Sequence, residues 1–432
     1  MERVSHYPEP LDDPGKDDRA AHGVPVVPAF DGYRAFAIMA IVLFHTLINS
    51  GVVADAGGNW GGQMIWGVLP HLVDVLFIIS GFVVFLPTVA QDGRFGDVGS
   101  YAIRRAARLL PAFWLSLVIL LVAMALVSPS YPPFPGLGEI LINFSGEHEI
   151  ATMFDSSLVA GFGINLPLWT LTLEIGFYIV LPFIAASYFR RPLIGLAIAA
   201  AIAILWREAF AHMGDIASLF GLHPSPDRLL ELRFASDQQL PHWAFSFAAG
   251  MTGAWAYVRI HRRYDPAEVA RIAAPIAAGS LAATAAFAYL AGRYAIDNPI
   301  PIPAAIARQS VFIAIGYTAS LATLMVSLAL APRRWQIVFA HPFARRLGDI
   351  SYGVYLIHGV ILWVLIVQFA LPQTGTIGAF ALWAAIVFPT SLAYGYLSAR
   401  FLEQPIRRWA HRFGRRGQTV SRRGAGGATG RA

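Results

Sequence analysis

Long apolar runs alternate with short polar segments along most of the chain. A helix that crosses the hydrocarbon core of a membrane takes about 20 mainly apolar residues. Runs of this length predict about ten membrane-spanning helices, at residues 31–50, 69–89, 110–128, 168–188, 192–210, 241–259, 271–291, 308–330, 350–370 and 376–400. The predicted fold class is therefore all-α, a polytopic integral membrane helical bundle.

The composition agrees with a membrane protein. Hydrophobic residues make up 56% of the 432 residues and charged residues only 13%, whereas soluble domains carry about 25% charged residues. The chain contains no cysteine, which excludes disulfides, thiolate nucleophiles and cysteine-ligated metals. We expect a disordered N-terminal segment over 1–29, one membrane domain over 30–410 and a basic disordered tail over 411–432.

The net charge of +6 comes mainly from arginines, and their positions predict the orientation. Most gather in alternate connections: Arg94, Arg104, Arg105, Arg108, Arg190, Arg191, Arg259, Arg262, Arg263, Arg271, Arg333, Arg334, Arg345 and Arg346. Arg228, Arg233 and Arg293 are exceptions on the other side, in connections that also carry acidic residues. The connections 51–68 and 129–167 contain no Lys or Arg. Because positive residues mark the cytoplasmic side, both termini are predicted to be cytoplasmic, in a multi-pass protein of the inner (plasma) membrane. This distribution, rather than nucleic-acid binding, accounts for the basic charge.

Arg34 and His45 lie eleven residues apart in the first predicted span. Eleven helical residues advance about 1100°, so both side chains share one face, about 16 Å apart along the axis. Ionisable groups inside a membrane are costly and usually functional. Snorkelling to the interface would explain Arg34, and a hydrogen bond between helices would explain His45. The alternative is that a neutral His45 imidazole acts as a general base.

Two carboxylates are placed at a depth similar to that of His45. Glu174 shares a helix face with Thr170 and Tyr178, each four residues away. Asp74 lies in the second span, near its outer end. Either carboxylate could orient His45 by fixing its tautomer, and a purely structural pair between helices is the alternative.

Four polar residues are possible supporting members of the site: Ser80, Tyr178, Tyr355 and His358. Ser80 adjoins Gly81, where small residues permit close helix approach. Tyr355 and His358 lie on one stripe of the ninth span, and packing with hydrogen bonding would also explain His358.

At the predicted cytoplasmic end, Arg104 and Arg108 lie four apart and project from one helix face. Such a pair suits a diphosphate, although cytoplasmic helix ends often carry arginines as a topology signal alone.

Taken together, these motifs resemble the acyltransferase-3 family of integral membrane O-acyltransferases. The resemblance covers nearly the whole chain and is carried by segments 30–45, 73–82, 104–111, 169–178, 347–358 and 403–405 in this order. It implies about ten helices and transfer of an acyl group, often acetyl, from cytoplasmic acyl-CoA. The implied acceptor is a hydroxyl of a cell-envelope glycan, a glycolipid or a secreted small molecule. The chain departs from the family where Glu174 is followed by Ile175 rather than by a second acid, and where Tyr33 and Ala35 flank Arg34.

The resemblance suggests roles for the singled-out residues. Arg34, Arg104 and Arg108 would hold the phosphates of acyl-CoA. His45 would deprotonate the acceptor hydroxyl, oriented by Glu174 or Asp74, and no metal is expected. An acyl-imidazole at His45 is the alternative chemistry. A transporter or exporter of an envelope lipid or sugar is the alternative function, because intramembrane ionisable residues also fit a proton-coupled path.

Overall fold

The computed structural model describes residues 27–52, 65, 68–127, 133–155, 158, 160–297, 311–410 and 412. Within these residues every element is helical. The long helices are α2 (Ala29–Asn49), α5 (Val73–Ala90), α6 (Val98–Val127), α9 (Trp169–Arg190), α10 (Pro192–Ala211), α13 (Leu240–Arg263), α14 (Pro266–Asp297), α16 (Val311–Leu330), α18 (Pro342–Val367) and α19 (Ile377–Ser398). Each coincides with one predicted span, which confirms the all-α membrane bundle. The predicted terminal segments, apart from 27–29 and 412, lie outside the described residues.

Shorter elements connect the long helices. They are α7 (Leu137–Ser145), α8 (His148–Thr152), α11 (Met213–Leu219), α12 (Pro226–Asp237), α17 (Arg333–Ala340), the 3-10 turns η2 (Pro70–Leu72), η3 (Ala160–Gly163) and η4 (Leu166–Leu168), and the π-helical turn η5 (Ala399–Glu403). In the described part of the chain, nine helical stretches are long and apolar enough to cross a membrane. The remaining predicted span, α13, is not among them. It packs against α5, α10 and α16, so protein rather than lipid surrounds much of its polar sequence.

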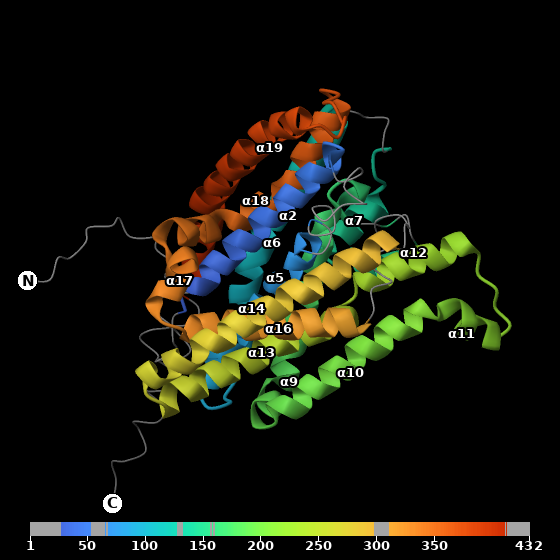
Figure 1. Ribbon diagram of the computed structural model, residues 1–432. Helices are drawn as coiled ribbons and strands as arrows, with labels where there is room; N and C mark the ends of the chain where they lie inside the picture. The colour runs from blue at the N-terminus through green and yellow to red at the C-terminus, as the bar shows by residue number, and fades with distance from the viewer. Residues whose placement is uncertain are drawn as a thin grey trace, which may run out of the picture.

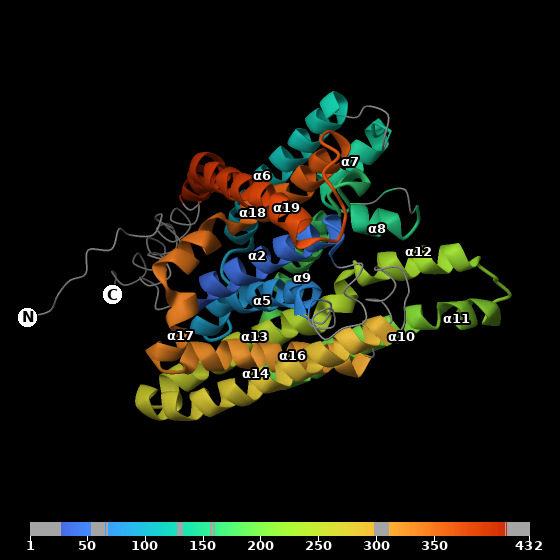
Figure 2. The ribbon, with the colours of Figure 1, turned by 45° about the horizontal axis from the view of Figure 1, so that its top comes forward.

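The bundle is organised around α2, α5 and α18. Helix α2 packs between α5 and α18, and α19 packs on the other side of α18. Beyond α5 follow α13 and then the hairpin of α14 and α16. Figure 1 and Figure 2 show this order, with α10, α11 and α12 extending away from the central helices. Helix α9 contacts α5, α6 and α13, which brings it to the centre of the bundle.

Helices α5 and α13 meet through their backbones. A Cβ added at Gly81 would lie 2.1 Å from the Phe247 carbonyl oxygen, and one added at Gly250 would lie 2.1 Å from the Ile78 carbonyl oxygen. Glycine alone permits this approach. The contact confirms the close helix packing expected beside Ser80.

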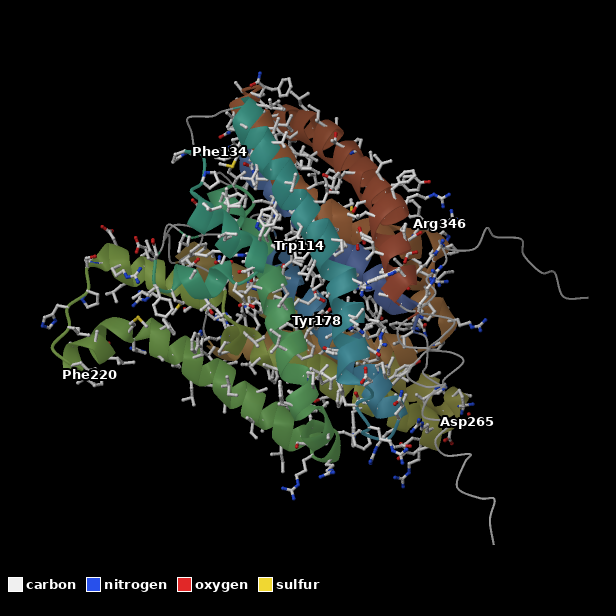
Figure 3. All side chains as sticks on the ribbon, turned by 180° about the vertical axis from the view of Figure 1, so that it is seen from behind. Trp114, Phe134, Tyr178, Phe220, Asp265 and Arg346 are labelled. Carbon is white, nitrogen blue, oxygen red and sulfur yellow. The ribbon has the colours of Figure 1, made fainter. Side chains whose placement is uncertain are left out.

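The two ends of the bundle differ in chemistry. Figure 3 shows Arg346 and Asp265 near one end and Phe134 and Phe220 near the other. We call the first the basic end, because the arginine-rich turns between α5 and α6, α9 and α10, and α13 and α14 alternate with the arginine-free connection before α9. Helix α2 starts at the basic end, since Gly32 and Asp31 contact Phe339 of α17 and Gly348 of α18.

Candidate functional site

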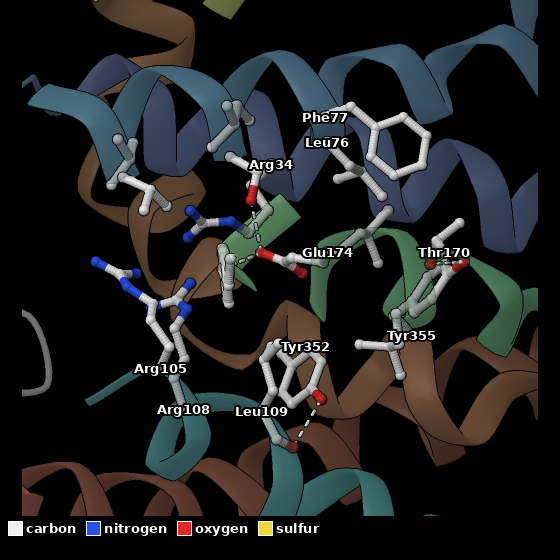
Figure 4. Close-up of a pocket in the computed structure, with 17 residues that line it drawn as sticks. Arg34, Leu76, Phe77, Arg105, Arg108, Leu109, Thr170, Glu174, Tyr352 and Tyr355 are labelled. Carbon is white, nitrogen blue, oxygen red and sulfur yellow. Dashed lines mark hydrogen bonds between the residues drawn. The ribbon is translucent and has the colours of Figure 1, made fainter. Parts of the chain in front are cut away.

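A narrow cavity of about 70 Å³ lies inside the bundle, between α2, α5, α6, α9 and α18. Its polar lining consists of Arg34, Ser80, Arg105, Arg108, Thr170, Glu174, Tyr178, Tyr352 and Tyr355. Figure 4 shows the arginines gathered on one side, Glu174 near the middle, and Thr170 with Tyr355 on the opposite side. Six of the residues that the sequence singled out, Arg34, Ser80, Arg108, Glu174, Tyr178 and Tyr355, therefore line one cavity.

Arg105 and Arg34 are held toward the cavity by different contacts. The Arg105 guanidinium lies 5.7 Å from the ring centre of Tyr101 and 5.4 Å from that of Tyr178, within reach of cation–π attraction. Its Nε is buried and has no hydrogen-bond partner among the residues that the structure describes. Arg34 lies 3.9 Å from Asp31 and interacts electrostatically with Glu174 as well. Because a buried donor without an acceptor is unfavourable, Arg105 is suited to binding an anion.

Glu174 is bound by hydroxyl groups at the centre of the cavity. Ser80 donates a hydrogen bond of 2.7 Å to its Oε1, and the Tyr178 hydroxyl donates a second bond to the same atom. Tyr178 is placed by the predicted helix face, four residues after Glu174. These bonds fix the carboxylate opposite the arginines.

Tyr355 and Thr170 close the cavity at the side away from the arginines. The Tyr355 hydroxyl lies 2.9 Å from Oγ1 of Thr170 and donates a 2.5 Å hydrogen bond to the Pro167 carbonyl. The Tyr355 carbonyl in turn lies 2.6 Å from Nδ1 of His358. Nε2 of His358 lies 3.1 Å from Nδ1 of His45. The paired histidines thus lie directly behind Tyr355, outside the residues that line the cavity.

The predicted pairing of His45 with Glu174 or Asp74 differs from the observed one. The hydrogen-bond partner of His45 is His358, and Glu174 instead bonds Ser80. Asp74 accepts hydrogen bonds from Ser246 and Thr318, at 2.6 and 2.8 Å, on a different side of α5. Asp74 and Ser80 are six residues apart, and six helical residues turn about 240° beyond a full revolution, so the two cannot share a face.

The predicted arginine pair is also shifted by one position. Arg105 and Arg108 line the cavity, and Arg104 does not. Hydrogen bonds from Ser100, with a smaller contribution from Arg104, lower the pKa of Asp97, the residue just before α6. The burial of Tyr101 and Leu109 sets the rotation of the helix.

Two polar residues, Glu403 and Arg207, received no role from the sequence patterns. Glu403, in the π-helical turn η5, accepts a hydrogen bond from Ser398 and interacts electrostatically with Arg108. The segment 403–405 had drawn attention only as a motif. Arg207, a single cation in the apolar run of α10, lies 5.7 Å from the ring centre of Trp243.

Arg207 belongs to a second polar cluster, on the far side of α5 from the cavity. It interacts electrostatically with Asp74 and Asp237. Nδ1 of His242 lies 3.2 Å from the Asp237 carboxylate. Burial raises the pKa of Asp237 to about 8, and Arg207 opposes this shift. Across the described ranges, no group of three or more His, Asp or Glu side chains is arranged to hold a metal ion.

These observations define a membrane-embedded helical protein with an arginine-lined cavity and, next to Tyr355 but outside the lining, a pair of histidines. Residues 27–399 match the family model described as an acyltransferase domain, and the chain belongs to this family. The resemblance expected from the motifs, and with it an enzyme of the acyltransferase class, is confirmed at the level of the family.

The chain is similar to three relatives. It is 24% identical over 405 residues to "Peptidoglycan O-acetyltransferase OatA" of Listeria monocytogenes, covering 88% of this chain and 56% of the relative. It is 25% identical to "Nodulation protein 10" of Rhizobium leguminosarum, covering 87% of this chain and 92% of the relative. It is 28% identical to "Putative peptidoglycan O-acetyltransferase YrhL" of Bacillus subtilis, over 36% of this chain and 23% of the relative. The chain thus spans about half the length of the Listeria protein. No solved structure is significantly similar to it.

Proposed function

We propose that the protein is an O-acyltransferase of the inner membrane that moves an acyl group, acetyl in the first instance, from cytoplasmic acyl-CoA to a hydroxyl of a cell-envelope glycan. One observation carries the proposal: the cavity is lined by the guanidinium groups of Arg34, Arg105 and Arg108 and by a single carboxylate, Glu174. Three guanidinium groups and one carboxylate face the cavity, while Asp31 and Glu403, outside its lining, interact with Arg34 and Arg108, so the lining is suited to an anionic ligand. The two relatives named as peptidoglycan O-acetyltransferases support the class of acceptor.

The donor is assigned to the basic end of the bundle. Positive residues mark the cytoplasmic side of membrane proteins, so the basic end faces the cytoplasm. Acyl-CoA is made there and carries a diphosphate, which guanidinium groups bind through paired, charge-assisted hydrogen bonds. The unpartnered Nε of Arg105 supplies a donor for this purpose. The acyl thioester would then point from the arginines toward Tyr355.

The reaction follows from the positions of the paired histidines. His45 removes the proton from the acceptor hydroxyl, and the resulting oxygen attacks the thioester carbonyl. The carbon–sulfur bond breaks, the thiolate of CoA leaves toward the basic end, and it takes up the proton that His45 removed. General-base help from a positioned histidine contributes about 10²–10⁴ in rate. Formation of an acyl-imidazole on His45 is the competing route to the same products.

The cavity must widen before the donor enters. Its volume of about 70 Å³ is far below the roughly 300–1,000 Å³ of ordinary ligand pockets. Tyr355 and Thr170 both line the cavity and are joined by a hydrogen bond of 2.9 Å, and the Tyr355 ring contacts the His358 ring. We propose that donor binding displaces this pair and joins the arginines to the histidines.

Donor binding tests the proposal directly. Acetyl-CoA should raise the melting temperature of the detergent-purified protein, because a ligand at 100 times its Kd stabilises the folded state by about 2.7 kcal/mol. S-acetylpantetheine, which lacks the phosphates, is the matched control and should have little effect. Equal stabilisation by both compounds, or by neither, would contradict the role of the arginines.

Transfer is tested separately with labelled acetyl-CoA. Label should enter alkali-labile esters of an envelope glycan fraction, and mass spectrometry of a deletion strain should show the loss of those esters. Exchange of labelled CoA into acetyl-CoA without an acceptor would favour the acyl-imidazole route. Absence of any ester difference between the strains would contradict the proposed acceptor.

A further inference from the structure

We propose that His358 is a positioning residue that fixes the tautomer of His45 and leaves the lone pair on Nε2 of His45. The catalytic consequence rests on the proposed function, whereas the tautomer itself does not. The inference starts from three consecutive groups: the Tyr355 carbonyl, the His358 ring and the His45 ring.

The first contact determines the protonation of His358. Its Nδ1 lies 2.6 Å from the Tyr355 carbonyl oxygen. A carbonyl oxygen only accepts hydrogen bonds, so Nδ1 of His358 must carry a proton. The His358 side chain is fully buried, and its hydrogen-bond partners are the Tyr355 and Val354 backbones and His45. No carboxylate of the described residues acts on this ring, so a charged form would be uncompensated there; the ring is therefore neutral and its Nε2 is an acceptor.

The second contact, between His358 and His45, determines the tautomer of His45. Nδ1 of His45 lies 3.1 Å from Nε2 of His358, and the ring centres are 5.2 Å apart. Since Nε2 of His358 accepts, Nδ1 of His45 must donate. A neutral His45 then has no proton on Nε2. In the described structure this nitrogen makes no hydrogen bond, and the His45 side chain is only partly buried, so Nε2 is available to an incoming hydroxyl.

The turn that bears His358 is clamped from outside the helix. Nδ2 of Asn165 donates a 2.7 Å hydrogen bond to the Leu356 carbonyl. A Cβ added at Gly359 would lie 2.3 Å from Oδ1 of Asn165, so this loop presses directly on the turn. The Tyr355 hydroxyl is tied to the Pro167 carbonyl. The Tyr355 side chain and the backbone on both sides of His358, at Leu356 and Gly359, are therefore held by Asn165 and Pro167.

The same arrangement serves either chemistry. As a general base or as a nucleophile, His45 would act through Nε2, while Nδ1 remains bonded to His358. His358 touches neither the acceptor nor the donor in this scheme. Its effect is to keep the reactive nitrogen deprotonated and the ring oriented, as second-layer partners do for other functional histidines.

Nitrogen NMR of the ¹⁵N-histidine-labelled protein tests the tautomer without any substrate. The His45 signals are identified by their loss in His45→Gln. The expected result is a protonated Nδ1 and an unprotonated Nε2 for His45 in the unmodified protein, and a mixture of tautomers in His358→Phe. A proton on Nε2 of His45 in the unmodified protein would overturn the proposal.

Kinetics with matched variants separate positioning from packing. His358→Gln keeps an acceptor oxygen near the position of Nε2 and should retain most of the activity. His358→Asn keeps a donor for the Tyr355 carbonyl but is too short to reach His45. It should lower kcat by at least about tenfold with an unchanged KM for acetyl-CoA.

The outcomes distinguish the two proposals. If His358→Gln and His358→Asn lose activity equally, in step with their melting temperatures, His358 has only a packing role and the inference fails. If His45→Ala remains active while the NMR result holds, the proposed function fails and the tautomer assignment stands.

Discussion

The arginine side of the cavity and the histidine pair behind Tyr355 contain different kinds of polar groups. The arginine side collects charges, with Arg34, Arg105 and Arg108 around the carboxylate of Glu174. The histidine pair is built from neutral donors and acceptors arranged in line. The first arrangement attracts a charged molecule, and the second defines where one proton lies. Binding and proton transfer are thus assigned to separate places in the bundle.

The strongest test of this separation is His45→Ala. Removing the imidazole should lower the transfer rate by about 10²–10⁴, while stabilisation by acetyl-CoA is unchanged. Rates and melting temperatures of the purified protein measure the two effects. His212→Ala, which alters an exposed histidine beyond α10, is the matched control and should be fully active. Retained activity in His45→Ala would remove this residue from the mechanism.

The converse change is made at the arginines. Replacing Arg105 and Arg108 together with Gln should raise the KM for acetyl-CoA by about 10- to 100-fold, since a hydrogen bond to a charged group contributes roughly 1.5–3 kcal/mol. The KM for the acceptor should not change. Arg104→Gln is the control, because Arg104 does not line the cavity. A larger effect from Arg104→Gln than from the double variant would contradict the observed rotation of α6.

The smallest effect is expected from Glu174→Gln. The amide keeps an acceptor for Ser80 and Tyr178 but loses the charge, so the free energy of unfolding should fall by only about 1–2 kcal/mol. Because Glu174 does not contact His45, kcat should stay within about twofold of the parent value. A fall in kcat of about 100-fold or more would instead show that Glu174 orients His45, as an acid does in a catalytic triad, and the separation would be lost. Initial rates and thermal unfolding measure both quantities.

The helices of this fold are predictable because lipid imposes a simple pattern on them. Runs of apolar residues located every span, including α14 and α16 around the proline-rich segment. The predicted boundaries were least accurate where a helix extends past the apolar run, as α6 does by starting at Val98. Helix α13 was found by the same pattern although it is too polar to qualify by hydropathy alone.

The contacts within the site were predicted less well, because they depend on helix rotation and on neighbours distant in sequence. Spacing alone could not choose between Arg104 and Arg105, which are adjacent on α6. Similar depth suggested a pair of His45 and Glu174, but depth says nothing about direction, and 313 residues separate His45 from its actual partner His358. Asp74 faces Ser246 and Thr318 for the same reason.

The backbone contact between α5 and α13 limits how a bulky thioester can gain entry. Where Gly81 meets Phe247 and Gly250 meets Ile78, the two backbones touch directly, and beside these points the Phe77 ring packs against the rings of Trp243 and Phe247. Moving α5 away from α13 would break these contacts, so the wall that carries Ser80 resists displacement. Helices α6 and α18 contribute long side chains such as Arg105 and Tyr355 to the cavity lining. Rotamer changes on these two helices, rather than movement of α5, would therefore widen the cavity for the donor.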